Sequence, residues 1–120
     1  MTHDIGDELV LRTGERDGCP VLTAHGPIDY STVDTLRAAM EKTVEGHPAR
    51  LVLDLAGVVF VDSSGLALLL TEDQRARARG GWVRLVAPAA QLTRLLRTTN
   101  LDQRLAVYDS VTAALASGSE

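Results

Sequence analysis

The chain has 120 residues, of which 45% are hydrophobic and 23% are charged, as in a soluble globular domain with a substantial core. The longest purely apolar run, Leu66–Leu70, is far shorter than the roughly 20 residues that a membrane-spanning helix needs. The formal net charge of −4 and the aromatic content of 3% disfavour a nucleic-acid-binding protein. Because Met1–Asp4 lacks the basic start and apolar stretch of a signal peptide, we expect a cytoplasmic protein.

Two features that often mark special chemistry have simpler explanations here. The single cysteine, Cys19, has no partner for an internal disulfide and no Cys or His neighbour at metal-ligand spacing, so we interpret it as a small side chain beside a turn. The arginines within Glu72–Arg79 follow two acidic residues, which is typical of a solvated helix face whose cations favour its C-terminal end. We expect neither a metal site nor a cofactor.

The first elements of the chain predict a hairpin. Glu8–Thr13 and Val21–His25 are short apolar-rich segments typical of strands. Gly14–Gly18 between them contains two glycines and predicts a turn. Gly26-Pro27 is expected to end the second strand.

The segment after this hairpin predicts a helix. Ser31 or Thr32 can accept hydrogen bonds from the free amides of its first turn. Gly46–Pro48 is expected to stop the helix. Apolar residues recur between these limits at helical spacing and form one stripe, namely Val33, Leu36, Met40 and Val44.

The middle of the chain predicts a buried strand and a second helix. Arg50–Leu55 is nearly continuously apolar, which suits a central strand. We expect a short connection over Ala56–Val61, followed by a helix that begins at Asp62–Gly65 and is closed by Gly80-Gly81. The buried stripe of this helix is predicted to be Leu66, Leu69 and Leu70.

The last third of the chain predicts two strands and two helices. Trp82–Val86 is typical of a strand, and Leu105–Tyr108 of a weaker one. Asp109 or Ser110 can cap a final helix that carries Val111, Ala114 and Leu115. Pro88 stands where a helix can begin, and the apolar face of that helix is formed by Leu92, Leu95 and Leu96.

The order β-β-α-β-α-β-α-β-α indicates an α/β fold. Strands that alternate with helices favour parallel crossovers, so we expect a mixed, mostly parallel sheet with an N-terminal hairpin and about four helices. No second core is needed. We expect one domain over residues 8–116, with loose termini at residues 1–7 and 117–120.

The segment Asp62–Gly65 is where a functional site is expected. Sites in open α/β sheets favour the carboxyl ends of strands, and a helix N-terminus presents unpaired N–H groups and the positive end of a dipole. A phosphate on Ser63 or Ser64 is therefore expected to find donors there. The same residue types are also ordinary helix caps, so the pattern alone does not separate the two interpretations.

An enzyme is the weaker hypothesis for this turn. Val61–Gly65 lacks the first glycine of the Gly-x-Ser-x-Gly elbow, and a serine nucleophile needs a positioned base. His3 is expected in a loose tail and His47 in a turn. His25 ends a predicted strand and could approach the serines, but no third residue is evident to orient it. We therefore predict no catalytic residues.

The most specific segment of the chain is Asp62–Leu66, preceded by an apolar strand and a phenylalanine. In this it resembles the STAS-domain anti-sigma factor antagonists, the family of the sporulation anti-anti-sigma protein. The resemblance extends from about Leu9 to Leu115. Further matching segments are Gly26-Pro27-Ile28-Asp29, Leu53-Asp54-Leu55, Gly80-Gly81, Pro88 with the leucines after it, and Asn100-Leu101.

The resemblance implies a phosphorylation switch. In this family the unphosphorylated protein binds an anti-sigma factor that is also a serine kinase with a GHKL-type ATP site, and binding releases a sigma factor. The kinase phosphorylates the serine directly after the aspartate, which is Ser63 here, and a PPM-type serine phosphatase reverses the step. The resemblance also implies that the partner-binding residues are Asp29, Asp62, Ser63, Ser64 and Gly65. Ser64 is the alternative phosphorylation site.

One position departs from the family pattern. Pro27 stands where the family often has an acidic residue, and a proline fixes φ and lacks an N–H donor. The contact made there, and with it the choice of anti-sigma factor, is expected to differ.

The alternative function is a non-switching STAS subunit of a stress-sensing or lipid-transport complex. The intact Asp-Ser-Ser-Gly turn in a stand-alone domain favours the switch.

Overall fold

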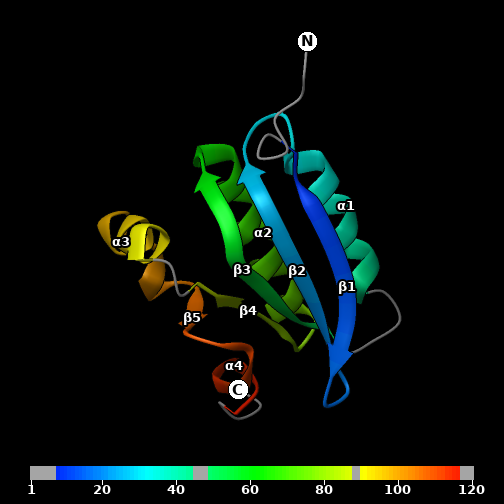
Figure 1. The fold of residues 1–120 in the computed structure, drawn as a ribbon. Coiled ribbons are helices and arrows are strands. Elements are labelled where there is room, and N and C mark those ends of the chain that lie inside the picture. The colour runs from blue at the N-terminus through cyan, green and yellow to red at the C-terminus, as the bar shows by residue number, and fades with distance from the viewer. Residues whose placement is uncertain (1–7, 45–48, 88–89, 117–120) are drawn as a thin grey trace.

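The computed structural model describes residues 8–44, 49–87 and 90–116 (Figure 1). The termini that we expected to be loose, the predicted helix stop at Gly46–Pro48 and the predicted helix start at Pro88 lie outside these ranges. The elements in chain order are β1 Val10–Arg16, β2 Cys19–Ile28, α1 Val33–Val44, β3 Arg50–Val61, α2 Ser63–Ala78, β4 Trp82–Val86, α3 Ala90–Thr98, the 3-10 helix η2 Leu101–Gln103, β5 Ala106–Tyr108 and α4 Val111–Ala116.

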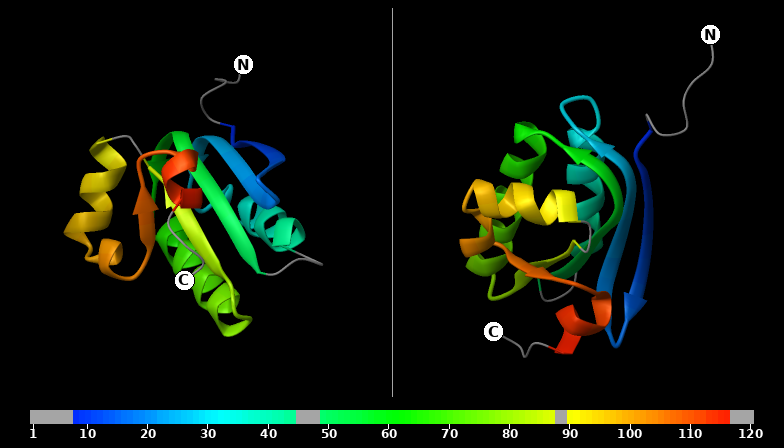
Figure 2. Two further views of the ribbon diagram at one scale, coloured as in Figure 1. Left: turned by 90° about the horizontal axis from the view of Figure 1, so that it is seen from below. Right: turned by 60° about the vertical axis from the view of Figure 1, so that its left-hand side comes forward.

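The strands form one five-stranded sheet in the order β1-β2-β3-β4-β5. The pair β1-β2 is antiparallel, and each later pair is parallel. This confirms the predicted α/β fold with a mixed, mostly parallel sheet and an N-terminal hairpin. Helices α1 and α2 lie on one face of the sheet, and α4 lies on the other (Figure 2).

The hairpin turn is tighter than predicted. We expected a turn over Gly14–Gly18, but Gly14 pairs with Val21 and β1 runs on to Arg16. Only Asp17 and Gly18 form the turn, with φ of 54° and 80°. Two adjacent left-handed residues match the twist of the flanking strands, which explains how so short a turn closes the hairpin.

Strands β2 and β3 are both longer than predicted. Gly26-Pro27 does not end β2, and the expected connection Ala56–Val61 is instead the last half of β3. The register between the two strands shifts twice, and each shift adds one extra residue on β3. Such bulges interrupt the alternation of inward and outward side chains by which a strand is recognised in sequence.

The main core lies between the sheet and helices α1, α2 and α3. The stripe predicted for α1 is confirmed at Val33, Leu36 and Met40, which are buried. The stripe predicted for α2 is wrong in part, because Leu66 and Leu70 are only half-buried. The helix instead turns a slightly different face to the sheet, formed by Gly65, Leu68, Leu69, Glu72, Asp73 and Ala76.

Several predicted element ends are confirmed. The chain leaves α2 through Gly80, which has a φ of +80°, and the Gly81 amide donates to the Ala76 carbonyl at 2.8 Å. Of the two residues proposed to cap α4, Ser110 does so, because its Oγ accepts from the Ala113 amide at 3.0 Å. Among the described residues, no helix has the length and apolar character to cross a lipid bilayer.

Candidate functional site

The candidate site lies at the carboxyl ends of the adjacent strands β2 and β3. There the loop between β2 and α1 meets the start of α2, at the upper end of the molecule in Figure 1. The Asp62 amide donates to the Ile28 carbonyl at 3.0 Å, which joins the ends of the two strands. The sequence placed a site at the end of β3, and the sheet register adds the end of β2 to it.

Asp62, and neither serine, caps helix α2. Its backbone is extended, with φ of −98° and ψ of −173°, and its Oδ1 accepts from the Ser64 and Gly65 amides at 2.9 and 3.1 Å. The Leu66 amide donates to the Asp62 carbonyl at 3.0 Å. We expected the amides of this turn to be free to donate to a phosphate. This is wrong for the Ser64 and Gly65 amides, because they already donate to the Asp62 carboxylate.

The two serines differ in their surroundings. Ser64 is half-buried, and its Oγ donates to Asp62 Oδ1 at 2.6 Å. Ser63 is the first residue of α2 and is exposed to solvent. Within the described part of the chain, no hydrogen bond engages its hydroxyl. A modifying enzyme can therefore reach Ser63 without breaking a cap interaction, whereas modification of Ser64 would remove one.

The loop before α1 is built around Asp29. Its Oδ1 accepts from the Ser31 amide at 2.9 Å, the Ser31 Oγ at 2.7 Å and the Thr32 amide at 3.1 Å. Ser31 and Thr32 were expected to accept amides at the helix start, but here their own amides are the donors. Thr32 Oγ1 instead accepts from the Asp29 amide at 2.9 Å and donates to the Pro27 carbonyl at 3.0 Å.

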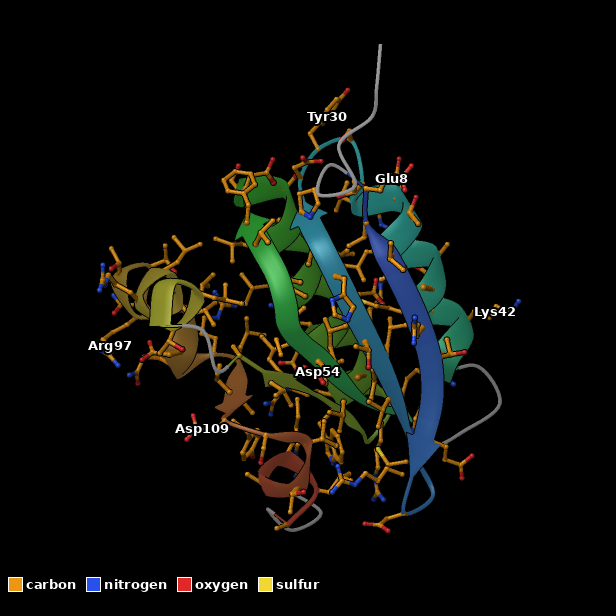
Figure 3. All side chains as sticks on the ribbon, viewed as in Figure 1. Glu8, Tyr30, Lys42, Asp54, Arg97 and Asp109 are labelled. Carbon is orange, nitrogen blue, oxygen red and sulfur yellow. The ribbon has the colours of Figure 1, made fainter. Side chains whose placement is uncertain are left out.

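Tyr30 connects this loop to the cap of α2. Its amide donates to Asp62 Oδ2 at 3.0 Å, which brings the Asp29 loop and the serine turn together. Its ring is 85% exposed and projects from the end of the molecule (Figure 3). We did not single out Tyr30 from the sequence, because nothing in a single tyrosine before a helix indicates exposure.

Both aspartates of the site favour the ionised form. The pKa of Asp62 is lowered, first by the hydrogen bond from the Ser64 hydroxyl and also by the backbone amides that it accepts. The pKa of Asp29 is lowered in the same way, first by the Ser31 hydroxyl. At neutral pH the site therefore carries two carboxylates whose hydrogen-bond partners are neutral groups, and its local charge is negative.

Gly65 has a steric role beneath the serine turn. It is buried, and a Cβ at this position would lie 2.7 Å from Ile28 Cγ2 and 2.9 Å from Val61 Cγ1. Both distances are too short for any side chain to be added without displacing its neighbours. The glycine lets α2 start close against the ends of β2 and β3, which sets the position of Ser63 at the surface.

The structure gives no support to a serine nucleophile. His25 is exposed, and its ring lies over Gly57, where a Cβ would come within 2.1 Å of Nδ1. This places the imidazole beside the middle of β3 and not beside the serines at its end. Over residues 8–44, 49–87 and 90–116, no three His, Cys, Asp or Glu side chains gather in a way that could hold a metal ion.

A family model of the STAS domain matches residues 11–114. The chain belongs to the STAS domain family. The match covers every strand and helix described above except the ends of β1 and α4, so it includes both loops of the candidate site.

Several proteins similar to this STAS protein are named anti-sigma factor antagonists. It is 27% identical to the anti-sigma F factor antagonist of Paenibacillus polymyxa, over 89% of this chain and 92% of that protein. It is 26% identical to the anti-sigma-F factor antagonist RsfA of Mycobacterium tuberculosis, over 97% of this chain and 92% of that protein. The crystal structure of an anti-sigma factor antagonist from Mycobacterium paratuberculosis superposes with a TM-score of 0.77 at 29% identity, covering 92% of this chain and 93% of that one.

Proposed function

We propose that this STAS protein is an anti-sigma factor antagonist controlled by phosphorylation of Ser63. In its unphosphorylated form it binds an anti-sigma factor and so releases a sigma factor, and phosphorylation ends this binding. The names of its relatives support the general role. The observation that carries the switch is the Ser63 hydroxyl, which is exposed and unengaged within the described residues beside the ionised Asp62.

The neighbouring serine fits the role less well. Ser64 Oγ is held by Asp62 Oδ1 at 2.6 Å, and this bond is the main reason why the pKa of Asp62 is low. A phosphate on Ser64 would replace that donor with negative charge next to the carboxylate. We therefore assign the switch to Ser63 and keep Ser64 as the alternative that the experiment below decides.

The added charge is sufficient to end binding. A phosphate adds about −1.5 to −2 charges at pH 7. At this site it would join Asp62 and Asp29, and the Ser64 and Gly65 amides, which would otherwise donate to it, already donate to Asp62. Like charges brought together at an interface cost several kcal/mol, and about 2.8 kcal/mol already weakens binding a hundredfold. No refolding of the domain is needed.

The proposed partner surface consists of Asp29, Asp62, Ser63 and Ser64. Gly65 supports it from below, because it is buried against Ile28 and Val61. Pro27 enters indirectly, since its carbonyl accepts from Thr32 Oγ1 and so shapes the Asp29 loop. The family pattern supports a partner with GHKL-type kinase activity and a PPM-type phosphatase that reverses the modification. We also propose that the domain is cytoplasmic and has no catalytic activity of its own.

The test is affinity capture of the anti-sigma factor, followed by measurement of its Kd. We expect Ser63→Ala to bind like the wild type and to resist phosphorylation, and Ser63→Asp to bind about a hundredfold more weakly. Gln74→Asp, on the exposed face of α2, is the control for added charge and should bind normally. Equal binding by Ser63→Asp and the wild type would contradict the charge switch. Capture of a transporter ATPase in place of an anti-sigma factor would favour the non-switching role.

A further inference from the structure

The last half of β3 has a strand neighbour on one side only. Strand β2 pairs with β3 as far as Val61, whereas β4 pairs with it only over Arg50–Asp54. In Figure 1 the carboxyl end of β3 accordingly extends past β4. Within the described residues, the edge of Ala56–Val61 that faces away from β2 has no strand beside it. Such an edge is a template for an added strand.

This edge carries exposed apolar side chains. Val59 is 62% exposed and Phe60 is 52% exposed. They border a groove of about 620 Å³ between β3 and α3, whose other lining residues are Val58, Val61, Leu92, Arg94, Leu95 and Thr98. Contiguous exposed apolar surface beside an open edge marks a site for a protein partner.

The charge of the groove is opposite to that of the serine turn. Arg94 is the charged residue among those that line the groove, and Arg97 extends from the same helix into solvent (Figure 3). The neighbouring loops carry the ionised Asp29 and Asp62. The groove therefore suits an occupant that is apolar and acidic.

We propose that an extended segment of the anti-sigma factor, with alternating apolar side chains and an acidic residue, adds as a strand to the free edge of β3. Its apolar side chains enter the groove and its carboxylate pairs with Arg94. An open strand edge offers backbone hydrogen bonds that a peptide satisfies and an acyl chain does not, which is why we assign a peptide. This inference rests on the proposed function and specifies its partner surface.

The position of the groove also bears on the switch. Val61, which lines it, is followed directly by Asp62 and Ser63. A phosphate on Ser63 would therefore stand at the end of a bound acidic segment. Repulsion from that segment adds to the repulsion at the serine turn.

The test uses the full chain and the anti-sigma factor identified by its release of a sigma factor. We expect Phe60→Ser and Arg94→Glu each to weaken binding about thirtyfold. The matched controls are Val10→Ser, an apolar residue 42% exposed on the opposite edge strand, and Arg79→Glu, an exposed arginine at the end of α2. Both controls should bind like the wild type.

Hydrogen exchange of the wild-type complex gives a second readout that needs no variant. Backbone amides within Val58–Val61 that do not bond to β2 should gain protection when the anti-sigma factor binds. Absence of this protection overturns strand addition even if Phe60→Ser fails to fold. Normal binding by Arg94→Glu overturns the acidic segment.

Three further outcomes test the groove proposal and the proposed function separately. If the wild type binds no anti-sigma factor, the proposed function itself fails. If Ser63→Asp abolishes binding while Phe60→Ser and Arg94→Glu bind normally, the switch stands and the groove proposal is wrong. If the free chain sediments as a dimer with the same amides protected, the occupant is a second copy and the proposal is also wrong.

Discussion

Two acidic residues, the N-cap of helix α2 and Glu72 within that helix, lie in contrasting surroundings. Asp62, at the N-terminus of the helix, accepts hydrogen bonds from the Ser64 amide and hydroxyl, the Gly65 amide and the Tyr30 amide. Glu72, in the middle of the helix, is only 7% exposed, and its Oε2 is buried with no hydrogen-bond partner among the described residues. The pKa of Asp62 is lowered by its donors, whereas the pKa of Glu72 is raised, chiefly by burial and then by the charge of Glu41.

The contrast separates a carboxylate that organises the fold from one that weakens it. The donors to Asp62 belong to the first turn of α2 and to the loop before α1, so the negative charge and the geometry of the proposed switch are maintained together. At Glu72 the charged form loses hydration without full compensation. Variants at the N-terminal end of α2 should therefore lose stability, and removal of charge from its middle should increase it.

The largest effect is expected beneath the cap. Gly65→Ala forces a Cβ against Ile28 and Val61, and we expect it to reduce the free energy of unfolding by about 2 kcal/mol. Urea denaturation measures the change. Gly14→Ala is the matched control, because a Cβ there has only the Val21 carbonyl oxygen near it, at 3.9 Å. Equal stability of the two variants would contradict the close packing at Gly65.

The next effect tests the cap itself. Asp62→Ala removes the acceptor of the Ser64, Gly65 and Tyr30 amides, and we expect it to lower Tm by about 4 °C. Asp62→Asn keeps a side-chain oxygen that can cap the helix and should retain most of the stability. Thermal unfolding by circular dichroism compares the three proteins. An unchanged Tm for Asp62→Ala would show that the Asp62 cap does not stabilise the site.

At Glu72 we expect a substitution to increase the free energy of unfolding and not to reduce it. We predict that Glu72→Gln raises the free energy of unfolding by about 1 kcal/mol at neutral pH, because it removes a buried charge. Since the pKa of Glu72 is raised by folding, the wild type loses stability as the pH rises through that value. The stability that Glu72→Gln gains over the wild type should therefore be smaller in acid. Glu15→Gln, at an exposed position of β1, is the control and should change little, whereas a destabilised Glu72→Gln would reverse the comparison.

The smallest effect is the pH dependence at Asp62. Folding lowers the pKa of Asp62, so its contribution to stability is present above the ordinary pKa of an aspartate and is lost as the pH falls through the lower, folded value. The difference in stability between the wild type and Asp62→Asn should accordingly decrease in acid. A series of urea denaturations at decreasing pH measures it, and a difference that grows in acid would contradict the assignment.

The sequence predicted the order of the elements because each helix has a clear apolar stripe and a recognisable start or end. Its largest errors in the bounds of the elements lie in β2 and β3, where two bulges disrupt the alternation of side chains through Ala56–Val61. Those bulges depend on pairing between strands, which is not visible in one strand alone. The exposure of Val59 and Phe60 was not predicted for the same reason, because their sequence is typical of an ordinary apolar connection.

The candidate site was predicted in part. The residues of the serine turn were located from their place after an apolar strand, and Asp29 entered through the family resemblance. The choice of Asp62 as the cap was missed, because aspartate and serine are about equally good caps. What decides between them is the Tyr30 amide, which comes from a loop distant in sequence and engages the second oxygen of Asp62.

The most direct test of the switch is the affinity of the chain for its anti-sigma factor before and after phosphorylation, with the phosphate located by mass spectrometry. We predict a phosphate on Ser63 and a loss of affinity of about a hundredfold. A phosphate found only on Ser64, or unchanged affinity of the chain phosphorylated at Ser63, would contradict it.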